Sequence, residues 1–411
     1  MRHWIARYQA WLLLGFIMAI CFGGGWGISL AVPLPAHDEF NIVRWEAQHL
    51  PGKWLYLTNR FFGGRLSPEE EDQRLGRFLV LTARIRELGR APAPDELEQR
   101  TELERLRGDR DALENDVEAI IEGRLTASLE DAGLQASIPF FPNARLVFPP
   151  VDFELDQPLR VVSVSRRDRI ELIERRPLRQ DLTSAEAVEI EAALEEDGSR
   201  SALVEALAGA ATYPSIVAPQ ADYLRLVETV AHEWVHHYLF CQPLGQRYFA
   251  SLELQTLNET VADLAGGDLA ALVVQRNPLS LEVAAELELL LPPEPEIDVD
   301  GVLRQLRLDV QALFDGGRVE AAEALMEQRR QELNAALGGE QRVVYRRINQ
   351  AFFASRSVYA DNPASIDPLG LKLEELRERT GSVAAFLRAA ARFTSGDDLD
   401  RLLQEAAQRA P

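Results

Sequence analysis

The sequence predicts an α+β protein with a single N-terminal transmembrane helix. Two helix-forming regions, 67–136 and 292–411, flank a region in which short β-prone runs alternate with prolines. This order predicts a helical hairpin, then a small, mostly antiparallel sheet packed on the helix over 221–241, then a helical C-terminal subdomain. A chain of 411 residues suggests more than one domain. We expect a cytoplasmic tip and membrane anchor at 1–36, an aromatic juxtamembrane segment at 37–66, a helical hairpin at 67–136, a central domain at 137–291 and a helical subdomain at 292–411.

The predicted anchor is the uncharged run over residues 11–32, which is long enough to cross a bilayer once. Arg2 and Arg7 precede this run and Asp38 follows it. The positive-inside rule then places the rest of the chain outside the cell membrane, as a single-pass protein. A cleaved signal peptide is the alternative, which the length of the run disfavours. The aromatic residues of 40–64 suit a membrane interface and a hydrophobic core equally well.

The hairpin begins at Ser67, which is a suitable N-cap because Pro68 follows it and Glu70 lies three residues beyond it. Pro92 ends this helix, and a second one from Asp95 carries apolar residues seven apart among dense charges. We expect a hairpin or short coiled coil, with the charges facing solvent.

The β-prone runs of 138–178 predict the sheet, and a capped helix follows at 183–196. Tyr213, Pro214 and Ser215 then form part of another short strand. Because proline has no N–H to donate in a ladder, we predict that this strand lies at an edge of the sheet.

A helix over 221–241 carries the chemistry. Apolar residues recur at helical spacing without glycine or proline, and His232 and His236 lie four residues apart on one face. That geometry can bind one metal ion. With only six histidines in the chain, this spacing would seldom arise by chance. Glu233 would face a water on the metal, which makes it the candidate general base.

A third ligand is available in the sequence Asn-Glu-Thr-Val-Ala-Asp at 258–263. Glu259 supplies the carboxylate, and Asp263 lies one helical turn further on. We expect Asp263 to accept the spare N–H of a ligating imidazole. Two imidazoles and one carboxylate predict Zn²⁺ as the cofactor.

These two motifs together resemble the gluzincin metallopeptidases, in which a glutamate from a following helix completes the zinc site. The segments 348–355 and 357–361 look like the Asn-Asn-Ala and Thr-Tyr segments of a family of predicted bacterial zinc aminopeptidases, with Gln350 in place of the second Asn. The resemblance covers roughly 213–393 and leaves the first half of the chain unexplained.

The resemblance implies further site residues. In gluzincins the edge strand beside the zinc helix pairs with substrate backbone, which points to Tyr213 and Ser215, and Asn349 is a further expected substrate contact. A tyrosine can stabilise the oxyanion in the aminopeptidase branch. No histidine follows Glu259, so we select Tyr359 over Tyr345 for this role.

We therefore predict a membrane-anchored zinc metallopeptidase that hydrolyses peptide bonds of a peptide or protein outside the cytoplasmic membrane, with aminopeptidase and endopeptidase activity both open. The alternatives are a catalytically silent zinc domain that binds an envelope partner, and a metal-free coiled-coil protein. A net charge of −21 argues against nucleic acid as a partner. The sequence does not predict the oligomeric state.

Overall fold

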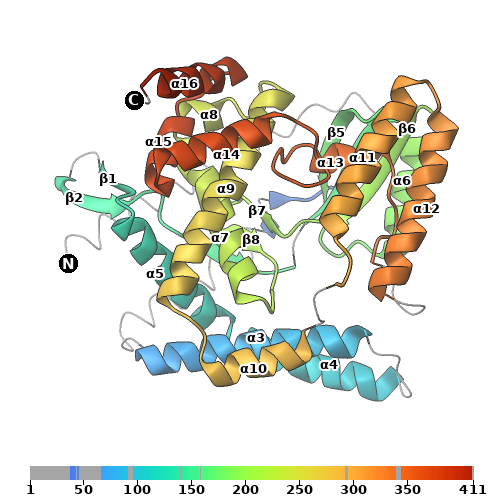
Figure 1. The fold of residues 1–411 in the computed structure, drawn as a ribbon. Coiled ribbons are helices and arrows are strands. Elements are labelled where there is room, and N and C mark those ends of the chain that lie inside the picture. The colour runs from blue at the N-terminus through green and yellow to red at the C-terminus, as the bar shows by residue number, and fades with distance from the viewer. Residues whose placement is uncertain are drawn as a thin grey trace.

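The protein has an α+β fold, as predicted. A computed structural model describes residues 38–42, 44–45, 66–90, 96–138, 141–157, 159–291, 295–338 and 344–409. Two central helices, α7 (Tyr223–Phe240) and α9 (Leu252–Arg276), connect the parts of the molecule. A layer of helices lies below them in Figure 1, a sheet with two long helices lies to one side, and the C-terminal helices lie above.

No helix in the described ranges is both long enough and apolar enough to cross a membrane. This finding contradicts the predicted single-pass anchor, and the predicted location in the cell membrane is corrected with it. The run over 11–32, on which both predictions depended, lies outside the described residues, as does most of the aromatic segment. One aromatic residue of that segment, Trp45, is a core residue: it is buried, and its Nε1 donates a hydrogen bond of 2.7 Å to Asp156.

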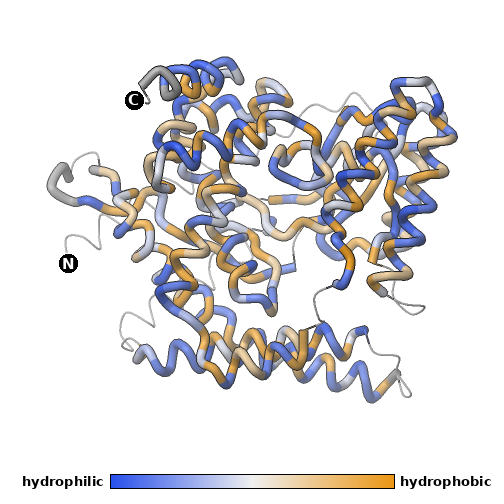
Figure 2. The backbone as a smooth tube through the Cα atoms, viewed as in Figure 1, coloured by the Kyte–Doolittle hydropathy of each residue, from blue (hydrophilic) through white to orange (hydrophobic). Residues whose placement is uncertain are grey.

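The N-terminal helices are α3 (Pro68–Arg90), α4 (Glu96–Asp111) and α5 (Glu114–Asp131). The predicted cap of α3 is confirmed, because the Glu70 carboxylate accepts from the Ser67 N–H at 2.7 Å and Ser67 Oγ accepts from the Glu70 N–H. The predicted second helix is divided into α4 and α5. Apolar and polar positions alternate along α3 (Figure 2), as expected for a helix with one buried face, and that face packs on α4, α5 and α10 (Leu281–Leu290).

The strands form a hairpin and two three-stranded sheets. They are β1 (Gln135–Ile138), β2 (Phe141–Val147), β3 (Phe153–Leu155), β4 (Arg160–Arg166), β5 (Leu172–Leu178), β6 (Arg200–Ala206), β7 (Gly209–Ala210) and β8 (Ser215–Val217). The sheets have the orders β3-β8-β7 and β5-β4-β6, and only the β3–β8 pair is parallel. The sheet was therefore correctly expected to be mostly antiparallel.

The predicted edge position of the strand after Tyr213 is wrong. Strand β8 lies between β3 and β7, in the middle of its sheet. Pro214 precedes β8 rather than forming part of it, so its missing N–H leaves no gap in the ladder. The edge beside helix α7 belongs instead to β7, which contacts that helix.

Three helices in the middle of the chain each begin at a residue whose side chain caps the first turn. Helix α6 (Ser184–Glu195) begins at Thr183 with the predicted reciprocal cap, helix α7 (Tyr223–Phe240) is capped by Asp222, and helix α9 (Leu252–Arg276) by Ser251, with the one-turn helix α8 (Pro243–Gln246) between them. Helices α7 and α9 pack on each other along their lengths and form the centre of the largest hydrophobic core.

The remaining helices divide into two groups. Helices α11 (Val299–Asp315), α12 (Val319–Gly338) and α13 (Gln350–Arg356) share a hydrophobic cluster, and α13 covers one face of the β5-β4-β6 sheet. Helices α14 (Leu369–Thr380), α15 (Val383–Ala390) and α16 (Gly396–Arg409) return to α9 (Figure 1). The segment between α13 and α14 thus passes from the sheet to the central helices.

Candidate metal centre

Helices α7 and α9 bring together the three predicted metal ligands. Nε2 of His232 lies 3.0 Å from Nε2 of His236, and Oε2 of Glu259 lies 3.6 Å and 3.4 Å from those two nitrogens. Ligand atoms at bonding distance from one tetrahedral zinc ion lie about 3.3 Å apart. The three atoms therefore have the spacing that one ion requires.

A glycine permits this close approach of the two helices. A Cβ added at Gly266 of α9 would lie 3.0 Å from the backbone nitrogen of His232 and 3.1 Å from its Cα. A larger residue at this position would push α9, and with it the Glu259 carboxylate, away from the two imidazoles. The requirement for glycine thus follows from the packing of the ligand helices.

Hydrogen bonds on the far side of each imidazole decide which nitrogen faces the centre. Nδ1 of His232 lies 2.7 Å from Oδ1 of Asp263, and Nδ1 of His236 lies 2.8 Å from Oδ1 of Asn258. Both oxygens accept, so each Nδ1 carries the proton and each Nε2 presents a lone pair to the centre. Asp263 lies where the sequence placed it. Asn258 was missed, although it precedes Glu259 in the same motif.

The charges of the cluster favour a bound cation. Burial lowers the pKa of His232, but Asp263 and Glu259 outweigh it and hold that pKa well above its usual value. Burial raises the pKa of Glu259, but the nearby His236 and His232 lower it by more. The pKa of this carboxyl therefore lies well below its usual value, and the group stays ionised. In the metal-free protein a proton on His232 supplies positive charge here, and a bound cation would replace that proton.

Glu233 lies beside this centre with its side chain 5% exposed. Burial raises its pKa, with His232 and His236 opposing the shift, which makes its carboxylate a stronger base than a solvated one. Its Oε1 faces the edge strand β7, because a Cβ added at Gly209 would lie 2.4 Å from it. The predicted base therefore lies between the metal ligands and a strand edge.

Tyr359 also lies at the centre, although it is one hundred positions from Glu259. Its ring centroid is 6.3 Å from that of His232, and burial raises its pKa to about 12, so the hydroxyl stays protonated. The segment after α13 is fixed to the ligand helix, because the Ala360 N–H donates to Thr260 Oγ1 at 2.8 Å. The position of Tyr359 is compatible with the predicted donor role.

Two further side chains at the centre were not predicted. Tyr248, in the turn after α8, donates a hydrogen bond to Oε1 of Glu259, and its ring meets that of His236 at a centroid distance of 6.2 Å. Arg175 of β5 lies near Tyr359, Glu259 and Tyr248. Neither residue belongs to a motif, so no sequence signal pointed to them.

The three expected substrate contacts are all buried and have structural contacts, and their role in substrate binding stays a prediction. Tyr213 is buried with its ring against His237, at a centroid distance of 5.1 Å. Ser215 is buried in β8, and its N–H donates to the backbone of Asp152. Asn349 caps α13 and donates to the Ala202 carbonyl at 2.9 Å. These contacts give all three residues a structural role.

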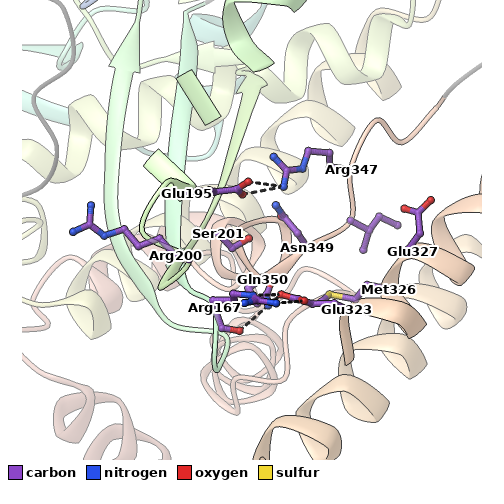
Figure 3. Close-up of a pocket in the computed structure, with 12 residues that line it drawn as sticks. Arg167, Glu195, Arg200, Ser201, Glu323, Met326, Glu327, Arg347, Asn349 and Gln350 are labelled. Carbon is purple, nitrogen blue, oxygen red and sulfur yellow. Dashed lines mark hydrogen bonds and ion pairs between the residues drawn. The ribbon is translucent and has the colours of Figure 1, made fainter. Parts of the chain in front are cut away.

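Asn349 also lines a cavity of about 420 Å³ between the sheet and α12 (Figure 3). Its charged walls are largely paired: Arg167 bonds Glu323 through two hydrogen bonds of 2.8 Å, and Arg347 bonds Glu195. None of the three metal ligands lines this cavity. It is separate from the metal centre.

No known protein family, no curated protein and no solved structure matches this chain. The resemblance to gluzincins therefore depends on the two zinc motifs and on the geometry described above.

Proposed function

We propose that this protein is a zinc-dependent metallopeptidase in which His232, His236 and Glu259 hold the metal. The observation that carries the proposal is the convergence of two imidazole Nε2 atoms and one carboxylate oxygen at the spacing of a tetrahedral zinc site. Both Nδ1 atoms are engaged elsewhere, so both Nε2 lone pairs are available to a metal. Nitrogen and carboxylate ligands suit zinc.

The chain's own residues supply the rest of the chemistry. Zinc, when bound, would act as a Lewis acid toward a peptide carbonyl and make water a better nucleophile near neutral pH. Glu233 accepts the proton of the attacking water and transfers it to the leaving amine, a task for which its raised pKa suits it. Tyr359, protonated at neutral pH, donates a hydrogen bond to the carbonyl oxygen as negative charge develops there.

The test combines metal analysis with a turnover screen. We expect elemental analysis of the purified chain to find about one zinc per molecule. Hydrolysis of a mixed peptide pool, measured as the release of primary amines, should stop when a chelator is added and return when zinc is restored. Glu233→Gln should retain zinc and lose almost all turnover, because an amide cannot accept the proton. Comparable turnover by this variant would refute the mechanism.

One observation favours a second function, that of a catalytically silent zinc domain that binds a partner protein. The side chains of His232, His236 and Glu259 are only 13%, 13% and 6% exposed, so a peptide must displace part of the surrounding structure to reach them. The same experiment separates the two functions. Full zinc occupancy without hydrolysis of any peptide in the pool would select the silent domain.

A further inference from the structure

Arg175 reaches the metal centre from a part of the chain far from the zinc motifs. It lies on β5, paired with Ser163 of β4, which is in turn paired with Leu203 of β6. Residues paired across antiparallel strands share one face of the sheet. Leu203 packs against Phe352 and Phe353 of α13, so the Arg175 side chain leaves the sheet on the face that α13 covers.

The guanidinium of Arg175 lies among groups of the metal centre without an ion pair of its own. It lies near Tyr359, Glu259 and Tyr248. Within the part of the chain that the structure describes, no carboxylate lies within ion-pair distance of it, and its buried Nε has no hydrogen-bond partner. The next residue, Arg176, faces the other side of the sheet and pairs with Glu174 at 2.7 Å.

Burial disfavours this charge, but the nearby Tyr359, Glu259 and Tyr248 outweigh burial and raise the pKa of Arg175, so it stays a cation. Its buried Nε–H is a donor without an acceptor, and planar N–H donors suit oxygen anions. A hydrogen bond from Arg175 would occupy a lone pair of the Tyr359 oxygen. The hydroxyl proton of Tyr359 is then free to point at a second acceptor.

We propose that Arg175 and Tyr359 together form an oxyanion-binding pair opposite the metal ligands, which binds the carbonyl oxygen of the scissile bond as it becomes negatively charged. The inference rests on the proposed peptidase function and adds a positively charged donor that no motif indicates. Arg175 contributes charge in a region of low dielectric, and Tyr359 contributes a neutral hydrogen bond. This pairing explains how a chain without a histidine after Glu259 can stabilise the oxyanion.

The test uses inorganic phosphate, a tetrahedral oxyanion, as a probe of the zinc-loaded protein. Isothermal titration calorimetry should show phosphate binding to the wild type and at least roughly 10-fold weaker binding to Arg175→Met, since one charged donor is lost. Zinc content, measured on the same samples, should not change. The matched control is Arg169→Met, which removes a half-exposed arginine from the turn before β5 and should leave phosphate affinity unaltered.

A second variant distinguishes the loss of the charge from a disturbed fold. Arg175→Gln keeps a polar side chain that can bond Tyr359 but lacks the charge, and it should weaken phosphate binding to a similar extent. Equal phosphate affinity in wild type and a folded, zinc-loaded Arg175 variant would overturn the inference and leave the proposed function standing. Failure of the wild type to take up zinc would refute the proposed function itself, and the inference with it.

Discussion

Replacing Gly209 by alanine should separate catalysis from folding and from metal binding. Gly209 lies on the edge strand β7, and an added Cβ would meet Oε1 of Glu233 at 2.4 Å and Cγ2 of Thr229 at 2.9 Å. The first contact is with the end of a flexible side chain, which can rotate away at little cost in stability. The variant should therefore fold, with Glu233 displaced.

The size of the effect follows from the displacement. Ordinary contact begins near 3.4 Å, so Oε1 must move by about 1 Å from its present position. A misplacement of that size costs roughly 10²-fold in rate, or about 2.7 kcal/mol of activation free energy. His232 and His236 keep their positions, so zinc content should not change.

The measurement compares peptide hydrolysis, zinc content and thermal unfolding of Gly209→Ala with those of Gly267→Ala. Gly267 lies in helix α9, and its added Cβ would have only Glu228 Oε1 nearby, at 3.7 Å. This control should keep full turnover and gain roughly 0.5–1 kcal/mol of stability, as alanine does in a helix. Unchanged turnover by Gly209→Ala, with zinc bound, would show that the contact with β7 does not place the catalytic carboxylate.

Three further predictions concern the ligands, the hydroxyl donor and acid stability. Glu259→Ala should lose zinc, whereas Asp263→Ala and Asn258→Ala should each lower the affinity for zinc roughly 10–100-fold in a chelator competition. Full zinc occupancy in Glu259→Ala would show that Glu259 is not a ligand. Tyr359→Phe keeps the ring and should lose roughly 10²-fold in turnover at constant zinc content; an unaltered rate would transfer the donor role to another group. Burial lowers the pKa of His237 to about 4, so this ring stays neutral in the folded protein while it takes up a proton below about pH 6.5 when unfolded. The free energy of unfolding should thus fall by about 3 kcal/mol in total as the pH is lowered from about 6.5 to 4. Denaturant titrations of the metal-free protein measure this loss. His237→Gln should remove this slope, and equal pH dependence of the two proteins would contradict the burial argument.

The sequence determined those features that depend on neighbouring residues. The cap at Ser67 and the cap at Thr183 appear in the structure as predicted, because capping needs only a side chain and the backbone a turn away. The facing positions of His232 and His236 follow from the helical period alone. Helix α9 likewise places Asp263 one turn from Glu259, where it reaches the ligand imidazole.

The tertiary structure alone decided the remainder of the site. Strand order placed β7 rather than β8 at the edge beside α7, although Pro214 suggested the reverse, because a proline constrains only the ladder in which it lies. Arg175, Tyr248 and Tyr359 meet near one carboxylate from three separate elements. Local patterns report periodicity and turns, whereas the contacts of these side chains depend on how a sheet and two helices pack, which is set by the whole core.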